Sequence, residues 1–129
     1  MHRRLFERLK ARFGPQARVR LLLSSEDDEL ARYFDSVAAL GSADIDTDGT
    51  IYVKVHDAAS AATKACLLEE CAHALQFLRD GAIELSADSP ERDRREYEVA
   101  ECLLRRPRWL THEDRAHYER VEQQLRNVI

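Results

Sequence analysis

The sequence lacks the long apolar runs that membrane proteins contain. Of its 129 residues, 44% are hydrophobic and 34% are charged, and no apolar stretch approaches the roughly 18 residues that a membrane-spanning helix needs. The first residues carry charge without a continuous apolar segment, so we expect no cleaved secretory signal. The composition predicts a soluble globular chain without a membrane span.

Cysteine, glycine and proline are also scarce. The chain has three cysteines, four glycines and three prolines. An odd number of cysteines without regular spacing argues against a disulfide-rich scaffold and favours free thiols in a reducing compartment, so we expect a cytoplasmic location. The length suits a single core, and we predict one domain over residues 1–129.

Basic residues are outnumbered by acids but are concentrated at the start of the chain. The formal net charge is −4, yet residues 1–20 hold seven of the 20 basic residues and one acid, Glu7. Apolar residues recur at helical spacing in this segment: Leu5, Phe6, Leu9 and Phe13. We therefore predict a basic amphipathic helix over residues 1–14, ended by Gly14–Pro15. It could contact nucleic acid, an acidic membrane surface or the acidic remainder of this chain. We favour the last, because an acidic body repels nucleic acid.

Two further segments are predicted strands. Residues 18–23 alternate between basic and apolar side chains and then become continuously apolar, as in a strand that enters a core. Thr50–Val55 has the strongest strand composition in the chain and is preceded by the turn signal Asp48–Gly49. Ser24–Ser25 and the acids that follow predict a helix N-terminus with hydroxyl caps. Residues 37–41 fit either a continuation of that helix or a short strand.

The centre of the chain is an apolar helix that carries acids and a histidine. Residues 65–81 read ACLLEECAHALQFLRDG. At 3.6 residues per turn, Glu69 and His73 lie one turn apart on one face, with Glu70 beside His73 and Cys66 at the edge of that face. Spacing alone fits either a solvated polar face or a metal site, since carboxylate, imidazole and thiolate all bind zinc.

The segment EECAHALQ, residues 69–76, resembles the active-site helix of zincin-like metallopeptidases, whose HExxH motif is commonly followed by Ala-Leu. The resemblance implies that Glu70 is the general base, that His73 binds zinc and that Glu69 replaces the first histidine ligand. A carboxylate can bind zinc, but its negative charge makes the metal-bound water less acidic. We interpret the motif as degenerate, with hydrolysis weakened or lost.

Another helix is predicted to begin at Ser89–Pro90, after a loop over residues 82–89. Glu96 falls in the middle of its apolar side, where a carboxylate needs either an arginine or a metal as its partner. The resemblance implies that Glu96 is the third metal ligand. Glu98 and Cys66 are the alternatives.

The remaining histidines lie outside the two predicted helices that carry the candidate metal ligands. Thr111 opens a last helix with a capping-box pattern, and His117 lies at the edge of its apolar stripe. His117 fits a core histidine, a group that orients a metal ligand, or a proton donor to substrate, and we take it as a catalytic candidate. His2 is expected to be solvated, and His56, at the end of the strand Thr50–Val55, could approach the site but is expected to be exposed.

The order of elements from about residue 50 to 125 is similar to small zincin-like domains at the C-termini of bacterial polymorphic toxins. This resemblance implies an α+β fold, with a small mixed or antiparallel sheet of about three strands on the active-site helix and two further C-terminal helices. Zincin-like domains place an edge strand just ahead of that helix, so Thr50–Val55 is expected to align an extended peptide substrate.

Two functions follow from these residues. The first is zinc-dependent hydrolysis of a peptide bond, with Glu69, His73 and Glu96 holding the metal and Glu70 activating water. The alternative is a non-catalytic interaction module that keeps the scaffold without metal-dependent activity. The expected partners are a peptide or protein substrate, or a protein partner.

Overall fold

The computed structural model describes residues 1–82 and 89–128, which form two compact units. The N-terminal unit spans Met1–Gly81 and the C-terminal unit Ala82–Ile129, and each is described by itself. The predicted loop over residues 82–89 lies largely outside the described residues, and a single domain over the whole chain stays a prediction. Within the described ranges, no helix has the length and apolar character required to cross a membrane.

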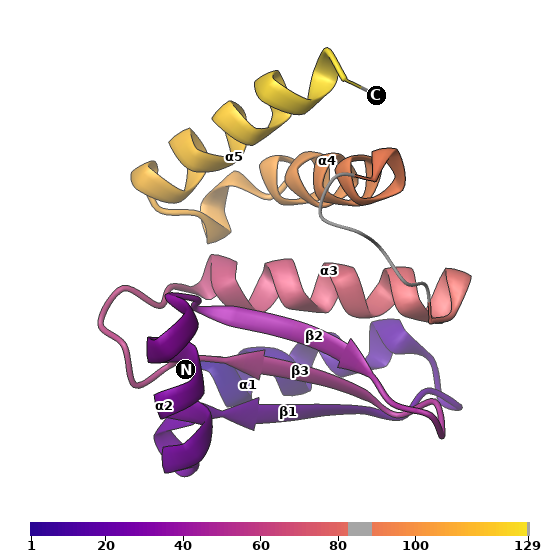
Figure 1. Cartoon of the computed structure of the whole chain (residues 1–129), viewed down its shortest axis with the longest axis vertical. Helices are drawn as coiled ribbons and strands as arrows, with labels where there is room; N and C mark the ends of the chain where they lie inside the picture. The colour runs from indigo at the N-terminus through magenta and orange to yellow at the C-terminus, as the bar shows by residue number, and fades with distance from the viewer. Residues whose placement is uncertain (83–88, 129) are drawn as a thin grey trace. The chain divides into compact units, whose positions relative to one another are not determined.

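The N-terminal unit contains three α-helices and one sheet, and the C-terminal unit contains two α-helices, in the part of the chain that is described (Figure 1). The bounds are α1 His2–Leu9, β1 Val19–Leu23, α2 Asp28–Val37, β2 Gly41–Ile45, β3 Ile51–Val55, α3 Lys64–Asp80, α4 Pro90–Leu104 and α5 His112–Arg126. This confirms the α+β class and the two C-terminal helices.

The sheet has the order β1-β3-β2 and is mixed, as expected. β1 runs parallel to β3 with Val19 opposite Ile51, and β2 runs antiparallel to β3 with Gly41 opposite Val55. The expectation that Thr50–Val55 forms an edge strand is wrong, because β1 and β2 pair with β3 on either side. The edge strand joined to β3 by the predicted hairpin turn is β2.

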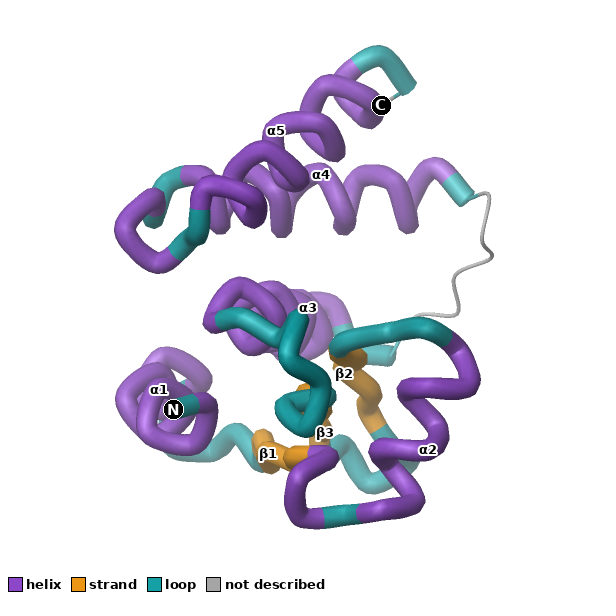
Figure 2. Tube along the Cα trace, turned by 90° about the vertical axis from the view of Figure 1, so that its left-hand side faces the viewer, coloured by secondary structure: helices purple, strands orange, loops and turns teal. Residues whose placement is uncertain are grey.

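One face of the sheet is covered by helices and holds the core. β1 and β3 alternate between buried and more exposed residues, and Ile51, Val53 and Val55 are almost fully buried. α3 packs on β2 and β3, α1 lies on the same side of the sheet, and α2 lies on the other side (Figure 2). Strict alternation in β3 therefore reflects one apolar face under α1 and α3.

The predicted basic amphipathic helix at the start of the chain is confirmed as α1, followed by a 3-10 turn over Lys10–Phe13. Its four apolar residues are buried, and the chain leaves the turn at Gly14, whose φ of 91° favours glycine. His2 is buried rather than solvated, because it continues the buried stripe of Leu5 and Leu9. Burial lowers the pKa of His2.

The two serines that were predicted as helix caps have another role. Asp27 caps α2 by accepting from Leu30 N–H at 3.2 Å, whereas Ser25 donates its hydroxyl hydrogen to Asp57 at 2.7 Å. Ser24 Oγ lies 2.8 Å from His56 Nδ1 and accepts from Ala58 N–H at 3.0 Å. These long-range contacts tie the end of β1 to the end of β3.

His56 is buried, contrary to the expectation that it is exposed. It is 4% exposed, its Nε2 lies 2.7 Å from Asp35 Oδ1, and its ring stacks on Phe34 of α2. Both ring nitrogens therefore have partners. The side chain anchors α2 to the strand end, and its buried position needs these partners.

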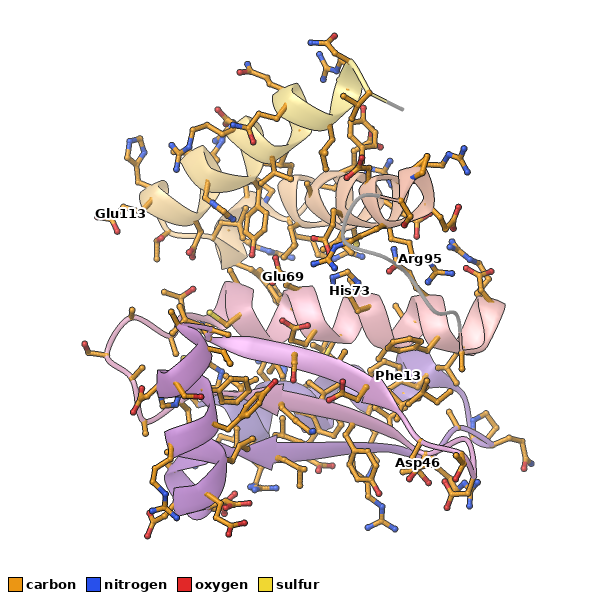
Figure 3. The ribbon with its side chains drawn as sticks, in the orientation of Figure 1. Phe13, Asp46, Glu69, His73, Arg95 and Glu113 are labelled. Carbon is orange, nitrogen blue, oxygen red and sulfur yellow. The ribbon has the colours of Figure 1, made fainter. Side chains whose placement is uncertain are left out.

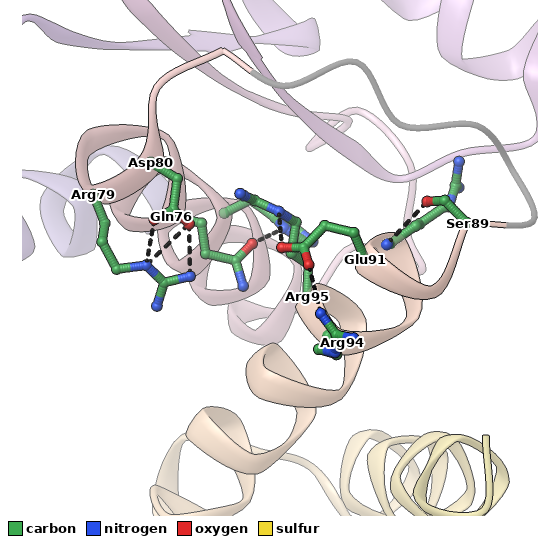
Figure 4. A network of polar contacts seen from close by, with 9 residues as sticks. Gln76, Arg79, Asp80, Ser89, Glu91, Arg94 and Arg95 are labelled. Atoms are coloured by element: carbon green, nitrogen blue, oxygen red, sulfur yellow. Dashed lines mark hydrogen bonds and ion pairs between the residues drawn. The ribbon is translucent and has the colours of Figure 1, made fainter. Parts of the chain in front are cut away.

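The C-terminal unit consists of α4 and α5 packed on each other. Ser89 caps α4 with Pro90 in its first turn, and Thr111 and Asp114 form a capping box at α5, as the sequence predicted. Near the start of α4, Glu91 contacts Arg94 at 3.0 Å and Arg95 at 3.4 Å (Figure 4). The capping patterns at Ser89–Pro90 and at Thr111 predicted where both helices begin.

Replacing Ser24 tests the contacts that join the two strand ends. We expect Ser24→Ala to lower the free energy of unfolding by about 2 kcal/mol, because His56 Nδ1 and Ala58 N–H lose a buried partner. Urea unfolding followed by circular dichroism measures this. The control is Ser36→Ala, which removes an exposed hydroxyl bonded only to Tyr33 O. Equal effects of both substitutions would contradict the assignment.

Candidate functional site

The polar face of α3 carries two of the predicted metal ligands. Glu69 and His73 lie one turn apart, are both half-buried, and point away from the sheet (Figure 3). They do so because the other side of α3, including Leu67, Cys71 and Ala74, is buried. The structure thus places a carboxylate and an imidazole on one face, as the spacing predicted.

Gln76, which helical spacing places on the same polar side as Glu69 and His73, orients the imidazole of His73, a role that the sequence had not suggested. The Oε1 atom of Gln76 lies 2.9 Å from His73 Nδ1, and since an amide oxygen can only accept, Nδ1 carries the hydrogen. The lone pair of His73 is then on Nε2, as in metal-binding histidines whose second nitrogen donates to a carbonyl. The three-residue spacing was the signal that could have identified Gln76.

Glu70, the predicted base, is buried against the start of β2. It is 5% exposed, and a Cβ atom on Gly41 would lie 2.9 Å from its Oε2 and 3.0 Å from its Cγ. A side chain at position 41 would force Glu70 to shift, since real Cβ atoms do not approach an oxygen so closely. Nothing in the sequence pattern pointed to Gly41, because the contact spans separate elements.

The outer edge of β2 lies next to Glu70. Leu40 O accepts from His56 N–H at 2.8 Å, and Asp46 N–H donates to Thr50 O at 2.9 Å, so even-numbered residues of β2 pair with β3. In an antiparallel register, the backbone groups of Gly41, Ala43 and Ile45 then face outward. This edge can accept an extended chain by strand addition.

Two cysteines of α3 differ in their surroundings. Burial, together with the neighbouring Glu70 carboxylate, raises the pKa of Cys71 to about 12. Its thiol stays protonated at neutral pH and is a poor metal ligand, because metals bind the thiolate. Cys66 is half-buried and remains the alternative ligand on this helix.

The other predicted site residues belong to the C-terminal unit. Glu96 is half-buried and Glu98 is exposed. His117 is exposed, with its ring edge-on to Tyr118 at 4.9 Å, so it is not a core histidine. Convergence of Glu96 or His117 with α3 depends on how two separate units dock and stays a prediction.

The donor atoms on α3 suit zinc in kind. Carboxylate oxygen and imidazole nitrogen are both common zinc ligands, and Gln76 supplies the outer hydrogen bond that such a histidine needs. Across residues 1–82 and 89–128, no three His, Cys, Asp or Glu side chains are grouped so as to hold a metal ion. The N-terminal unit therefore offers two of the three predicted ligands.

Comparisons with protein-family models, with curated proteins and with solved structures found no significant match to this chain. We therefore infer the function from the residues of α3 and β2 and from their contacts.

A substitution at Gly41 tests the position of Glu70. We expect Gly41→Ala to lower the free energy of unfolding by about 1–3 kcal/mol, because the added methyl group overlaps the Glu70 carboxylate. In a Glu70→Ala background the same change should cost clearly less. A double-mutant cycle measured by urea unfolding gives the coupling. Additive effects would show that the carboxylate lies elsewhere.

The raised pKa of Cys71 predicts how stability depends on pH. The unfolded thiol ionises near pH 9 whereas the folded thiol ionises near 12, so the folded state binds more protons between these values. The free energy of unfolding should fall as pH rises above about 9, and Cys71→Ala should remove that part of the slope. Unfolding curves between pH 8 and 10.5, roughly, would measure it. Identical slopes for the two proteins would contradict the burial argument.

Proposed function

We propose that this chain is a zincin-type peptide hydrolase in which Glu69 replaces the first histidine ligand and turnover is weakened or lost. The observation that supports this most is the bond from His73 Nδ1 to Gln76 Oε1, one turn beyond Glu69. This bond sets the tautomer in which the lone pair is on Nε2, the form of histidine that binds zinc, and Glu69 lies on the same face of the helix. We take the fold to be zincin-like and the location to be cytoplasmic, in keeping with three free cysteines.

Glu69 and His73 would hold zinc, with Glu96 as the predicted third ligand. When bound, zinc polarises a peptide carbonyl and makes water more acidic. Two carboxylates and one imidazole neutralise the metal's charge more completely than neutral ligands do. Glu69 therefore decreases the acidity of bound water, and slow hydrolysis is the expected result.

Glu70 would take a proton from the attacking water and return it to the leaving amine. Its carboxylate is buried beside Gly41, which supports a defined position for proton transfer. The exposed His117 is the candidate donor of a further proton.

The peptide substrate would lie extended along β2. The outward backbone groups of Gly41, Ala43 and Ile45 can pair with it, and Gly41 is also the residue that contacts Glu70. Strand addition would therefore bring a peptide bond close to the base. β2 takes the role that the sequence assigned to Thr50–Val55.

A non-catalytic interaction module is the second candidate. The replacement of the first histidine by Glu69 favours it. In this function β2 would bind a protein segment without cleaving it.

Restoring the lost histidine distinguishes the two functions. If the chain is a weakened hydrolase, Glu69→His should increase cleavage of a fluorescent casein substrate with added zinc by about tenfold or more, since a neutral ligand makes bound water more acidic. Glu70→Gln should abolish cleavage in that background. Cleavage that never appears, although zinc binds, would identify the interaction module.

Zinc content provides the matched measurement. We expect the wild-type chain to bind one zinc by elemental analysis after dialysis against zinc, and His73→Ala to lose it. Glu96→Gln should weaken binding about 10–100-fold, whereas Glu98→Gln should not. A wild-type chain that stays free of metal would rule out the hydrolase.

A further inference from the structure

The first helical segment presents a strongly basic surface. Its apolar residues face the core, which leaves Arg4, Arg8, Lys10 and Arg12 exposed. We call these four residues the basic face. Because the apolar side is buried in the protein's own core, the position of α1 forces these cations outward.

The basic face has no acidic partner within residues 1–82 and 89–128. Arg3 pairs with Glu26 and Arg18 with Asp48, whereas no ion pair or hydrogen bond joins the side chains of the basic face to any described residue. Arg4 and Arg8 lie four residues apart, a spacing at which like charges destabilise a helix. Packing against the acidic remainder of the chain, which we favoured from the sequence, accounts for Arg3 alone.

An apolar pocket adjoins the basic face. It has a volume of about 460 Å³, and its lining includes Lys10, Phe13, Pro15, Ala17 and Val19. This volume lies within the range of roughly 300–1,000 Å³ found for ligand pockets. Lys10 belongs to both features, so a cation lies at the rim of an apolar hollow.

We propose that this surface docks an acidic protein segment, with carboxylates on the basic face and one large apolar side chain in the pocket. Charge complementarity favours an acidic partner. The apolar lining of the pocket favours a partner that also carries a large apolar side chain, which a segment of acidic residues alone does not have. The proposal does not depend on the hydrolase or on α3.

Two other anionic partners fit the surface less well. Phe6 and Phe13 are buried, so this segment exposes no aromatic ring on which nucleic-acid bases can stack. The apolar side of α1 is also buried, so the helix cannot insert it into a membrane.

The test measures binding of the full chain to a fluorescein-labelled, glutamate-rich peptide with one central phenylalanine, by fluorescence anisotropy at low and physiological salt. We expect binding that weakens with salt. The same peptide with alanine at its centre should bind about tenfold more weakly, because the anchor is lost. The double change Arg8→Glu/Arg12→Glu should weaken binding of both peptides by about tenfold or more.

Two variants make the outcome specific. Ala17→Phe fills the pocket and should remove the difference between the two peptides while keeping the salt dependence. Arg32→Glu, an exposed charge reversal on α2, should leave binding unchanged, and circular dichroism checks that each variant is folded. No binding at low salt, equal binding of both peptides, or tighter binding of single-stranded DNA or phosphatidylserine vesicles would overturn the proposal.

Discussion

The packing of α3 on β2 and β3 is the contact on which the rest of the N-terminal unit depends. It buries Leu67 and Ala74 completely against the sheet, and burial of this kind contributes most of the free energy of folding. Burying one side of a helix determines how the helix is rotated about its own axis. This rotation determines the direction in which every other side chain of α3 points. Glu69 and His73 are outward-facing as a consequence of apolar burial on the opposite side.

The same packing places Glu70 in a costly environment. A carboxylate removed from water loses hydration that must be replaced by polar contacts, and here it lies against the strand start at Gly41. A side chain at position 41 would displace the Glu70 carboxylate from this position, so the strand and the helix constrain each other. A buried carboxylate beside an edge strand of the described sheet is a more specific feature than a row of acids on a surface helix. The functional proposal depends on that difference.

Local signals in the chain predicted the structure correctly where their partners are also local, and failed where a distant residue competes for the same group. The caps at Ser89 and Thr111 and the turn at Asp48–Gly49 were predicted correctly, since each involves residues within about four positions of one another. The assumed caps at Ser24–Ser25 were wrong because Asp57, far along the chain, binds both serines. A serine hydroxyl can bond either to a nearby backbone group at a helix start or to a distant side chain. The local sequence pattern does not distinguish these two cases.

The sequence by itself determined the α+β class, the amphipathic first helix and the shared face of Glu69 and His73, because helical periodicity depends only on spacing. Tertiary structure decided that β3 is central, that β2 supplies the open edge next to α3, that Gly41 contacts Glu70, and that His56 is buried between Ser24 and Asp35. The pairing of β1 with β3, the contact of Gly41 with Glu70 and the two contacts of His56 each join residues more than about 20 positions apart. Such contacts depend on which apolar faces pack together, and that packing depends on the whole sequence rather than on any local segment.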